Sequence, residues 1–219
     1  IFATVQSISK DLEKFSPTDF DYLIVDECHH AAANTYQKIF TYFHPKFILG
    51  LTATPERSDG EDMLELFQNV AHKMDLKTAV ERGVLVPIRC IWVKTNIDLT
   101  DVRINGIKYN SQDLESKLFI PERNQLIVDT YLKYVNGKKT VIFCASVDHA
   151  AEIAKLLRDS GVKAEAVSGR DRVEAREKIL KDYETGSTNV LCACDLLNEG
   201  WDSPHTTVLF MARPTMSKT

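Results

Sequence analysis

Two adjacent carboxylates follow an apolar run near the start of the chain. Asp26 and Glu27 come directly after Tyr22–Val25, a run typical of a buried strand. In open parallel sheets, ligands bind beyond the carboxyl ends of the strands. An aspartate there can hold Mg²⁺ directly or through water, and a neighbouring glutamate can orient or deprotonate a water that attacks a γ-phosphate. The pair therefore predicts phosphate chemistry, although two acidic residues that simply begin a helix would give the same pattern.

A second apolar run ends in hydroxyl groups. Thr52 and Thr54 follow 47–51, and Pro55 comes next, which prevents a helix from continuing through it. Residues two apart on an extended chain point to the same side. Both hydroxyls can therefore meet the carboxylate pair or a neighbouring domain.

Short β-branched runs alternate with amphipathic stretches, a pattern typical of α/β proteins with parallel sheets. Helical periodicity is clearest at 150–157 and 175–183. A polar segment at 96–121 interrupts the alternation with the turn dipeptide Asn105-Gly106 and a helical patch at 114–118. We predict two lobes, 1–95 and 122–219, joined by a connector at 96–121. The predicted strands are 2–5, 22–25, 47–51, 88–93, 140–144, 164–167, 190–193 and 207–210.

Composition limits the class of protein. The 219 residues include 27 Lys+Arg and 31 Asp+Glu, a net charge of −4, and 44% are hydrophobic, enough to build a core and to exclude disorder of the whole chain. No apolar run is long enough to cross a bilayer, so we expect no membrane partner and an intracellular protein, cytoplasmic or nucleoid-associated. Five cysteines predict small buried side chains in a reducing compartment, as at Cys90, Cys144 and Cys192.

The two strand-end motifs together resemble a known family. Asp26-Glu27-Cys28-His29, followed by Leu49-Gly50-Leu51-Thr52-Ala53-Thr54-Pro55, is similar to motifs II and III of superfamily 2 helicases of the DExH kind. The upstream stretch 2–7 resembles the segment that contacts nucleic acid before motif II. The form of motif III, with Glu56-Arg57 after it, is closest to the branch of repair and transcription helicases and restriction-enzyme translocation subunits.

This resemblance implies two RecA-like lobes with parallel sheets, the first incomplete here, and ATP with Mg²⁺ as cofactors. Asp26 would hold Mg²⁺ through water, Glu27 would activate the attacking water, and His29 would complete the catalytic motif. The pair Thr52 and Thr54 would couple the nucleotide state to the nucleic-acid side. Thr4, in the upstream segment, would contact nucleic acid.

The second half of the chain carries further matches in the order of the family. Residues 140–146 are similar to motif IV, 167–169 to the stretch after it, 190–204 to motif V, and 211–217 to the lead-in to motif VI. The resemblance implies that nucleic acid is contacted at Ser146, Gly169 and Cys194, where relatives often carry Thr at the last position. It also implies that Gly200 and Asp202 contact the nucleotide.

Two parts of the family pattern are missing. The phosphate loop Gly-x-x-x-x-Gly-Lys-[Ser/Thr] does not occur, and the nearest sequence, 137–140, has Leu132 in place of the first glycine and predicts a loop before a strand. The motif VI arginines would fall beyond Thr219. We therefore interpret the chain as an interior fragment of a nucleic-acid-dependent ATPase with further domains, acting on DNA in preference to RNA. The alternative is a non-catalytic nucleic-acid- or nucleotide-binding module with the same fold.

Several other residues allow two interpretations each. The pair His29-His30 could bind a metal, but helix-start residues are favoured because successive side chains point apart; Cys192 and Cys194 are favoured as core residues. Trp201 could stack on a base, although burial is favoured. The basic pairs could contact phosphate or be solvated charges: Lys138-Lys139, and Arg170 with Arg172.

Overall fold

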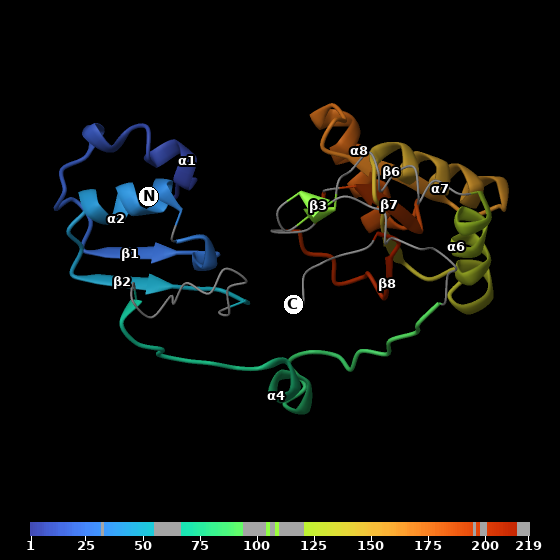
Figure 1. The fold of residues 1–219 in the computed structure, drawn as a ribbon, viewed down its shortest axis with the longest axis horizontal. Coiled ribbons are helices and arrows are strands. Elements are labelled where there is room, and N and C mark those ends of the chain that lie inside the picture. Colours follow the sequence, from blue (N-terminus) through green and yellow to red (C-terminus); the bar gives the residue numbers. More distant parts are fainter. Residues whose placement is uncertain are drawn as a thin grey trace. The chain divides into compact units, whose positions relative to one another are not determined.

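The chain folds into two compact units, residues 1–91 and 92–218 (Figure 1). The computed structural model describes residues 1–31, 33–54, 67–93, 104–105, 108–109, 121–194, 196–197 and 201–213. The predicted α/β class with parallel sheets is confirmed.

The first unit is built on a pair of parallel strands. Strand β1 (Tyr22–Val25) pairs with β2 (Phe47–Gly50), in a register that sets Tyr22 opposite Phe47 and Val25 opposite Gly50. Helix α2 (Asn34–Tyr42) connects the two strands, and α1 (Val5–Ile8) lies with it on one side of the pair (Figure 1). The core on that side includes the buried Phe43, whose ring lies 5.1 Å from that of Phe20. The unit also contains the short helices η1 (Leu12–Lys14), η2 (Cys28–His30) and α4 (Leu76–Glu81).

Two of the strands predicted before residue 95 are wrong. Residues 1–4 form no strand, because the Thr4 side chain accepts a hydrogen bond from the Ser7 amide at 3.2 Å and so begins α1 at Val5. Residues 88–93 form neither helix nor strand, and Trp92 is 93% exposed. Their β-branched composition favours an extended chain, but a strand also requires a neighbour with which to pair.

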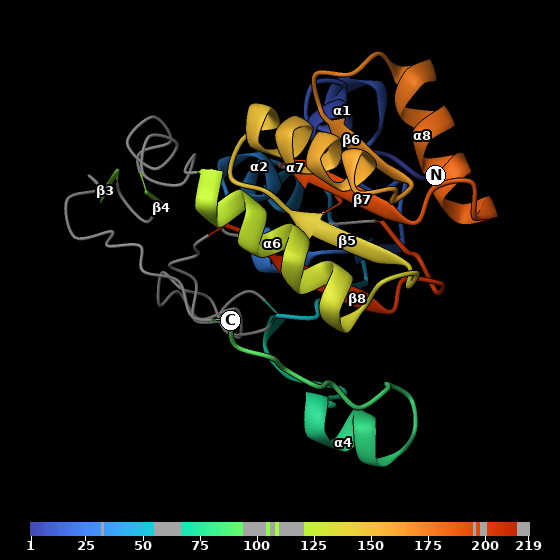
Figure 2. The same ribbon diagram turned by 90° about the vertical axis from the view of Figure 1, so that its right-hand side faces the viewer.

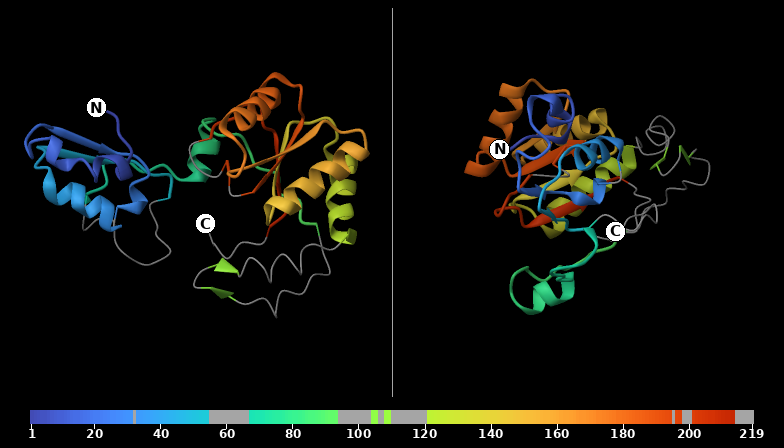
Figure 3. Two further views of the ribbon diagram at one scale, coloured as in Figure 1. Left: turned by 90° about the horizontal axis from the view of Figure 1, so that it is seen from above. Right: turned by 90° about the vertical axis from the view of Figure 1, so that its left-hand side faces the viewer.

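The second unit contains a four-stranded parallel sheet in the order β6-β7-β5-β8. Its strands are β5 (Thr140–Phe143), β6 (Ala164–Ser168), β7 (Val190–Cys194) and β8 (Val208–Met211). Helices α6 (Pro121–Tyr134) and α7 (Val147–Asp159) cover one face, and α8 (Val173–Thr185) covers the other (Figures 2 and 3). Four strands and the helices α7 and α8 therefore lie at the predicted positions, whereas α6 was not predicted.

The two faces of this sheet follow the alternation of side chains along β5 and β7. Ile142 and Cys192 face the core formed with α6 and α7, while Val141 and Leu191 pack against Tyr183 of α8. Burial on both faces explains why β5 and β7 are apolar throughout rather than alternating with polar residues.

The connector and the cysteines give mixed outcomes. Strands β3 (Ile104–Asn105) and β4 (Lys108–Tyr109) pair antiparallel, whereas Gly106 of the predicted turn and the helical patch at 114–118 lie outside the described residues. Cys28, Cys144, Cys192 and Cys194 are buried. The prediction for Cys90 is wrong, because its side chain is exposed.

Among the helices that the structure describes, none combines the length and apolarity that a membrane span requires.

Candidate functional site

The carboxylate pair lies where β1 leaves its ladder with β2. The Leu51 amide donates to the Val25 carbonyl at 2.8 Å, and the Cys28 amide donates to the Leu51 carbonyl at 3.0 Å. These two bonds bracket Asp26 and Glu27, so the chain between them turns away from β2 at the carboxyl end of the strand. Both predicted acidic residues are thereby placed at the edge of the sheet where ligands bind in parallel α/β folds.

Glu27 has a left-handed backbone conformation, with φ of 49° and ψ of 43°. A non-glycine residue in this region costs on the order of 1–3 kcal/mol and persists where the surroundings impose it. Here the Glu27 amide donates to Asp26 Oδ1 at 3.0 Å, and the next residue, Cys28, is buried. Burial raises the pKa of the Cys28 thiol, with smaller contributions from the two neighbouring carboxylates, so this side chain is an uncharged anchor.

A single imidazole nitrogen joins the two strand ends. His29 Nδ1 lies 3.3 Å from Glu27 Oε2 and 3.1 Å from Thr52 Oγ1. The Thr54 amide in turn donates to Thr52 Oγ1 at 3.1 Å. Nδ1 donates to the carboxylate when it carries a proton, and accepts from the threonine hydroxyl when it does not. The structure thus brings Glu27, His29, Thr52 and Thr54 into one chain of contacts, which we call the strand-end relay.

The acidic pair fits a magnesium ion that keeps several waters. Carboxylate oxygens are the hard ligands that Mg²⁺ prefers, and the ion is commonly held by one or two carboxylates together with substrate phosphates. In the part of the chain that the structure describes, no cluster of three or more His, Cys, Asp or Glu residues could hold a metal. Asp26 would therefore hold such an ion without a protein cage. His29 and His30 are the last two residues of η2 and do not begin a helix, so the helix-start interpretation is wrong in this detail.

Gly50 was not singled out in the sequence. A Cβ at this position would lie 2.7 Å from Phe67 Cε1 and 2.8 Å from Cys28 Sγ. Absence of a side chain therefore lets Cys28 and Phe67 pack against the end of β2. A glycine inside a strand, which often marks a close approach, was the available signal.

Thr4 uses its hydroxyl locally. Besides accepting from the Ser7 amide, Thr4 Oγ1 donates to Ser7 Oγ at 2.9 Å. The residue is exposed and begins α1.

Three of the predicted residues of the second unit lie at one edge of its sheet. Ser146 follows β5, Gly169 follows β6, and Cys194 ends β7; because these strands are parallel, their carboxyl ends share an edge. Ser146 caps α7 by accepting from the His149 amide at 3.1 Å. Gly169 is exposed, whereas Cys194 is only 5% exposed and belongs to the core, which keeps its thiol away from the surface.

The loop that carries Asp202 is tied to α8. Tyr183 Oη lies 2.9 Å from Thr206 Oγ1, which donates to Ser203 Oγ at 2.8 Å. The ring of Trp201 lies 6.2 Å from that of Tyr183 and is partly buried, which favours packing over base stacking. Asp202 itself is exposed, and Gly200 lies outside the described residues.

Lys139 fits neither of the two interpretations given for the basic pairs, which were a phosphate contact or a solvated charge. Its ammonium nitrogen lies 4.4 Å from the centroid of the Tyr183 ring, buried and without a hydrogen-bond partner, and burial lowers its pKa. Both phosphate contact and full solvation are therefore wrong for Lys139, while Lys138, Arg170 and Arg172 are exposed. The stretch 137–140 is a loop into β5, with Gly137 at a φ of 82°, as predicted.

These features define a RecA-like α/β protein. Helices cover parallel strands in both units, an acidic pair lies at a strand end of one unit, and capped loops lie at the strand ends of the other. Residues 1–57 match the family described as "Type III restriction enzyme, res subunit", and residues 122–219 match "Helicase conserved C-terminal domain". The chain thus carries, in this order, a segment similar to the restriction-enzyme family and a segment similar to the helicase C-terminal domain, as the resemblance to superfamily 2 helicases predicted.

Similar sequences come from phage, yeast and bacteria. The chain is 31% identical to a 51.5 kDa protein of a Lactococcus phage over 89% of its own length and 43% of that protein. It is 27% identical to the putative ATP-dependent helicase IRC3 of Saccharomyces cerevisiae, over 100% of this chain and 33% of that protein. It is 30% identical to the type I restriction enzyme EcoAI endonuclease subunit of Escherichia coli, over 83% of this chain and 24% of that protein. The chain thus spans less than half the length of each of these relatives.

Solved structures share the fold. The helicase domain of Pyrococcus furiosus Hef matches with a TM-score of 0.50 at 16% identity, over 97% of this chain and 70% of that one. Saccharomyces cerevisiae Dbp5 bound to RNA and ADP BeF3 matches with a TM-score of 0.51 at 14% identity, over 97% of this chain and 50% of that one. At these identities the likeness concerns the fold alone.

Proposed function

We propose that the chain is part of a nucleic-acid-dependent ATPase, a helicase or translocase that couples ATP hydrolysis to movement along a strand. The observation that carries this proposal is the strand-end relay, because it connects a carboxylate suited to water activation with both threonines of the next strand end. The match of residues 122–219 to the helicase C-terminal domain and the names of the relatives support it.

The proposed chemistry uses ATP with Mg²⁺. Bound magnesium would offset charge on the phosphates, and Asp26 would hold it through water. Glu27 would orient the attacking water and accept its proton. A protonated Glu27 no longer offers a charged acceptor to His29, so the Nδ1 hydrogen bond would shift toward Thr52 and report the change to the second strand end. That ADP BeF3 occurs in the Dbp5 structure supports a nucleotide role for this fold.

We further propose that the strand-end loops contact nucleic acid through its phosphates. Ser146 and Gly169 offer a hydroxyl and an exposed backbone, and Cys194 could contribute only main-chain groups, because its thiol is buried. Thr4 would contact the strand from the first unit, and Gly200 with Asp202 would contact nucleotide. Contacts to the phosphates of a nucleic acid carry no sequence preference. Since the chain has a net charge of −4, binding should be weak and sensitive to salt.

DNA is proposed as the substrate in preference to RNA, because a restriction-enzyme subunit is among the relatives and one family match carries that description. Comparing stimulation of the ATPase by matched DNA and RNA oligonucleotides tests this preference. A protein with this substrate would work inside the cell, in the cytoplasm or associated with the nucleoid.

The test is Glu27→Gln in the full-length protein. Loss of the carboxylate should lower nucleic-acid-stimulated turnover by about 10²–10⁴-fold while ATP binding, followed by calorimetry, survives. Glu13→Gln, an exposed change in η1 of the same unit, is the matched control and should leave turnover unchanged. Undiminished turnover in Glu27→Gln would remove this residue from the mechanism. A wild-type protein that binds nucleic acid without turnover would favour the non-catalytic module instead.

A further inference from the structure

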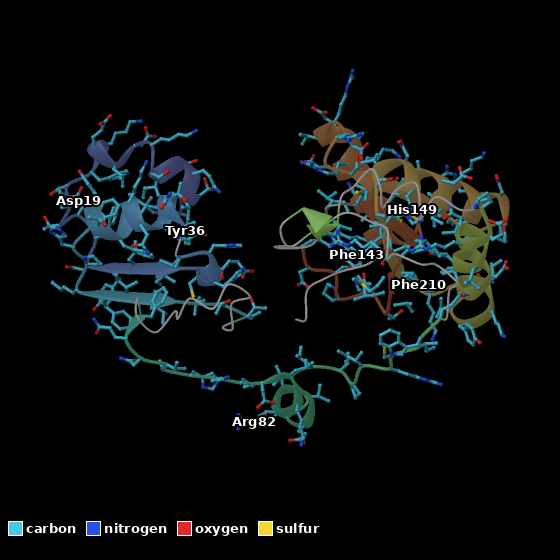
Figure 4. The ribbon with its side chains drawn as sticks, in the orientation of Figure 1. Asp19, Tyr36, Arg82, Phe143, His149 and Phe210 are labelled. Atoms are coloured by element: carbon cyan, nitrogen blue, oxygen red, sulfur yellow. The ribbon has the colours of Figure 1, made fainter. Side chains whose placement is uncertain are left out.

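A histidine is almost fully enclosed in the second unit. His149, in the first turn of α7, is 1% exposed and lies in the interior of the unit (Figure 4). The Ala145 amide donates to its Nδ1 at 3.2 Å, and Nε2 lies 3.2 Å from Asn124 Oδ1. The Arg123 guanidinium also approaches Nε2, at 3.3 Å. The turn before α7 and the first turn of α6 thus both contact one imidazole.

These contacts define the proton on the ring. Because Nδ1 accepts from the Ala145 amide, a neutral imidazole must carry its hydrogen on Nε2, which then donates to Asn124 Oδ1. A second proton would set an N–H against the Ala145 N–H and place two cations side by side. Burial, and secondarily the Arg123 charge, lower the pKa of His149 to about 4. The ring is therefore neutral and has one fixed tautomer at physiological pH.

The groups that the imidazole holds are those of the turn after β5. His149 contacts this turn twice, since its ring accepts from Ala145 and its own amide donates to Ser146 Oγ. The turn consequently cannot move without breaking a bond to α7. Ser146 is the residue of this turn with the proposed contact to nucleic acid.

The arginine beside the ring extends the same arrangement to the neighbouring strand. Arg123 Nη2 donates to the Ala212 carbonyl at 2.5 Å. Ala212 follows β8, which pairs with β5 so that Phe143 lies opposite Met211. The first turn of α6 therefore contacts the residue after β8 directly through Arg123, and the turn after β5 indirectly, through Asn124 and His149.

We propose that His149, oriented by Asn124, is a positioning residue for nucleic-acid binding: it holds the Ala145-Ser146 turn in the geometry that presents Ser146 to a phosphate. This inference rests on the proposed function of the same sheet edge. It assigns to a core residue an effect on the apparent KM for nucleic acid rather than on the chemical step. A side chain that only filled space would have no such selective effect.

The test exploits two amides that each replace one ring nitrogen. In His149→Asn the amide oxygen can take the place of Nδ1 and keep the Ala145 bond. In His149→Gln the amide can take the place of Nε2 and keep the Asn124 bond, but the Ala145 acceptor is lost. Both variants remove the ring, so they disturb the core similarly. They differ in which hydrogen bond survives.

The measurements use the full-length protein and a fluorescein-labelled single-stranded DNA oligonucleotide. We expect His149→Gln to raise the KM for oligonucleotide in the stimulated ATPase, and the Kd by anisotropy, about fivefold or more, while His149→Asn stays within about twofold of wild type. The kcat should be similar in all three proteins. Equal KM values in the two variants, or a kcat that falls with unchanged KM, would overturn the inference.

The outcomes separate this inference from the proposed function. Wild-type protein without stimulated turnover contradicts the proposed function, and the anisotropy comparison then still decides for or against the positioning role. Absence of oligonucleotide binding contradicts both. If a variant does not fold, hydrogen exchange of the Ala145 amide in wild type replaces it: we expect slow exchange that slows further with oligonucleotide. Fast exchange that oligonucleotide leaves unchanged would overturn the positioning role.

Discussion

Acidification below about pH 6.5 should destabilise the second unit through His149. In the folded protein the pKa of this histidine is lowered from 6.5 to about 4, chiefly by burial and then by the Arg123 charge. Above pH 6.5 the imidazole is neutral whether the chain is folded or not. Below that pH the unfolded chain binds a proton that the folded chain refuses until about pH 4, so stability is lost as the pH falls through this window.

The size of the effect follows from the two pKa values. Over the whole window, a change from 6.5 to about 4 corresponds to about 3 kcal/mol of unfolding free energy. Between pH 7 and pH 5, which covers most of it, the expected loss is about 2 kcal/mol. That is a large share of the stability of a small domain, which is typically about 5–15 kcal/mol.

Tryptophan fluorescence can follow this unit separately. The chain has two tryptophans: Trp92 is 93% exposed, whereas Trp201 packs partly buried against Tyr183. In a Trp92→Phe background, urea unfolding followed through Trp201 at pH 7 and pH 5 therefore reports the second unit. His149→Gln in the same background should lose about 2 kcal/mol less than the parent between the two pH values.

An exposed histidine supplies the control. His205 lies in the loop before β8 with its side chain exposed, and His205→Asn should show the same pH dependence as the parent. If His149→Gln and the parent lose equal stability between pH 7 and pH 5, the imidazole is not held neutral. The tautomer argument would then fail with it.

Two further changes test packing in each unit. Gly50→Ala should destabilise the first unit by about 1–3 kcal/mol, because the new methyl group meets Phe67 and Cys28, and alkylation of Cys28 followed by mass spectrometry should accelerate; an unchanged rate would contradict the close approach. Tyr183→Phe should cost about 1 kcal/mol by removing the bond to Thr206 while keeping the ring. Hydrogen exchange in the loop 201–207 should then rise, and protection equal to wild type would show that the hydroxyl does not hold the loop.

Strands buried on both faces were predictable, and isolated apolar runs were not. The expected strand at 140–144 corresponds to Thr140–Phe143, and that at 190–193 to Val190–Cys194. Their continuous apolar character is itself the consequence of burial between helices, so the signal lies within the strand. The runs 2–5 and 88–93 have similar composition, but a strand also depends on a partner that the local sequence does not contain.

The candidate site divides in the same way. Asp26, Glu27, Thr52 and Thr54 could be placed together from sequence, because each follows an apolar run and the ends of parallel strands share an edge. The pairing of His149 with Asn124 could not, since the two residues are 25 positions apart and no periodicity links them. A buried polar network depends on side chains converging from separate helices.

Exposure decides what each of the two histidines can do. The His29 side chain is 20% exposed, and its Nδ1 can donate to the Glu27 carboxylate when it carries a proton or accept from the Thr52 hydroxyl when it does not. His149 is 1% exposed and contacts an amide N–H and an asparagine oxygen, so only one arrangement of its proton satisfies both. A change of charge at Glu27 can therefore alter the partner of His29, whereas the partners of His149 stay fixed across physiological pH. The proposed helicase or translocase activity requires both properties, a contact that changes with the bound nucleotide and a binding surface whose geometry stays fixed.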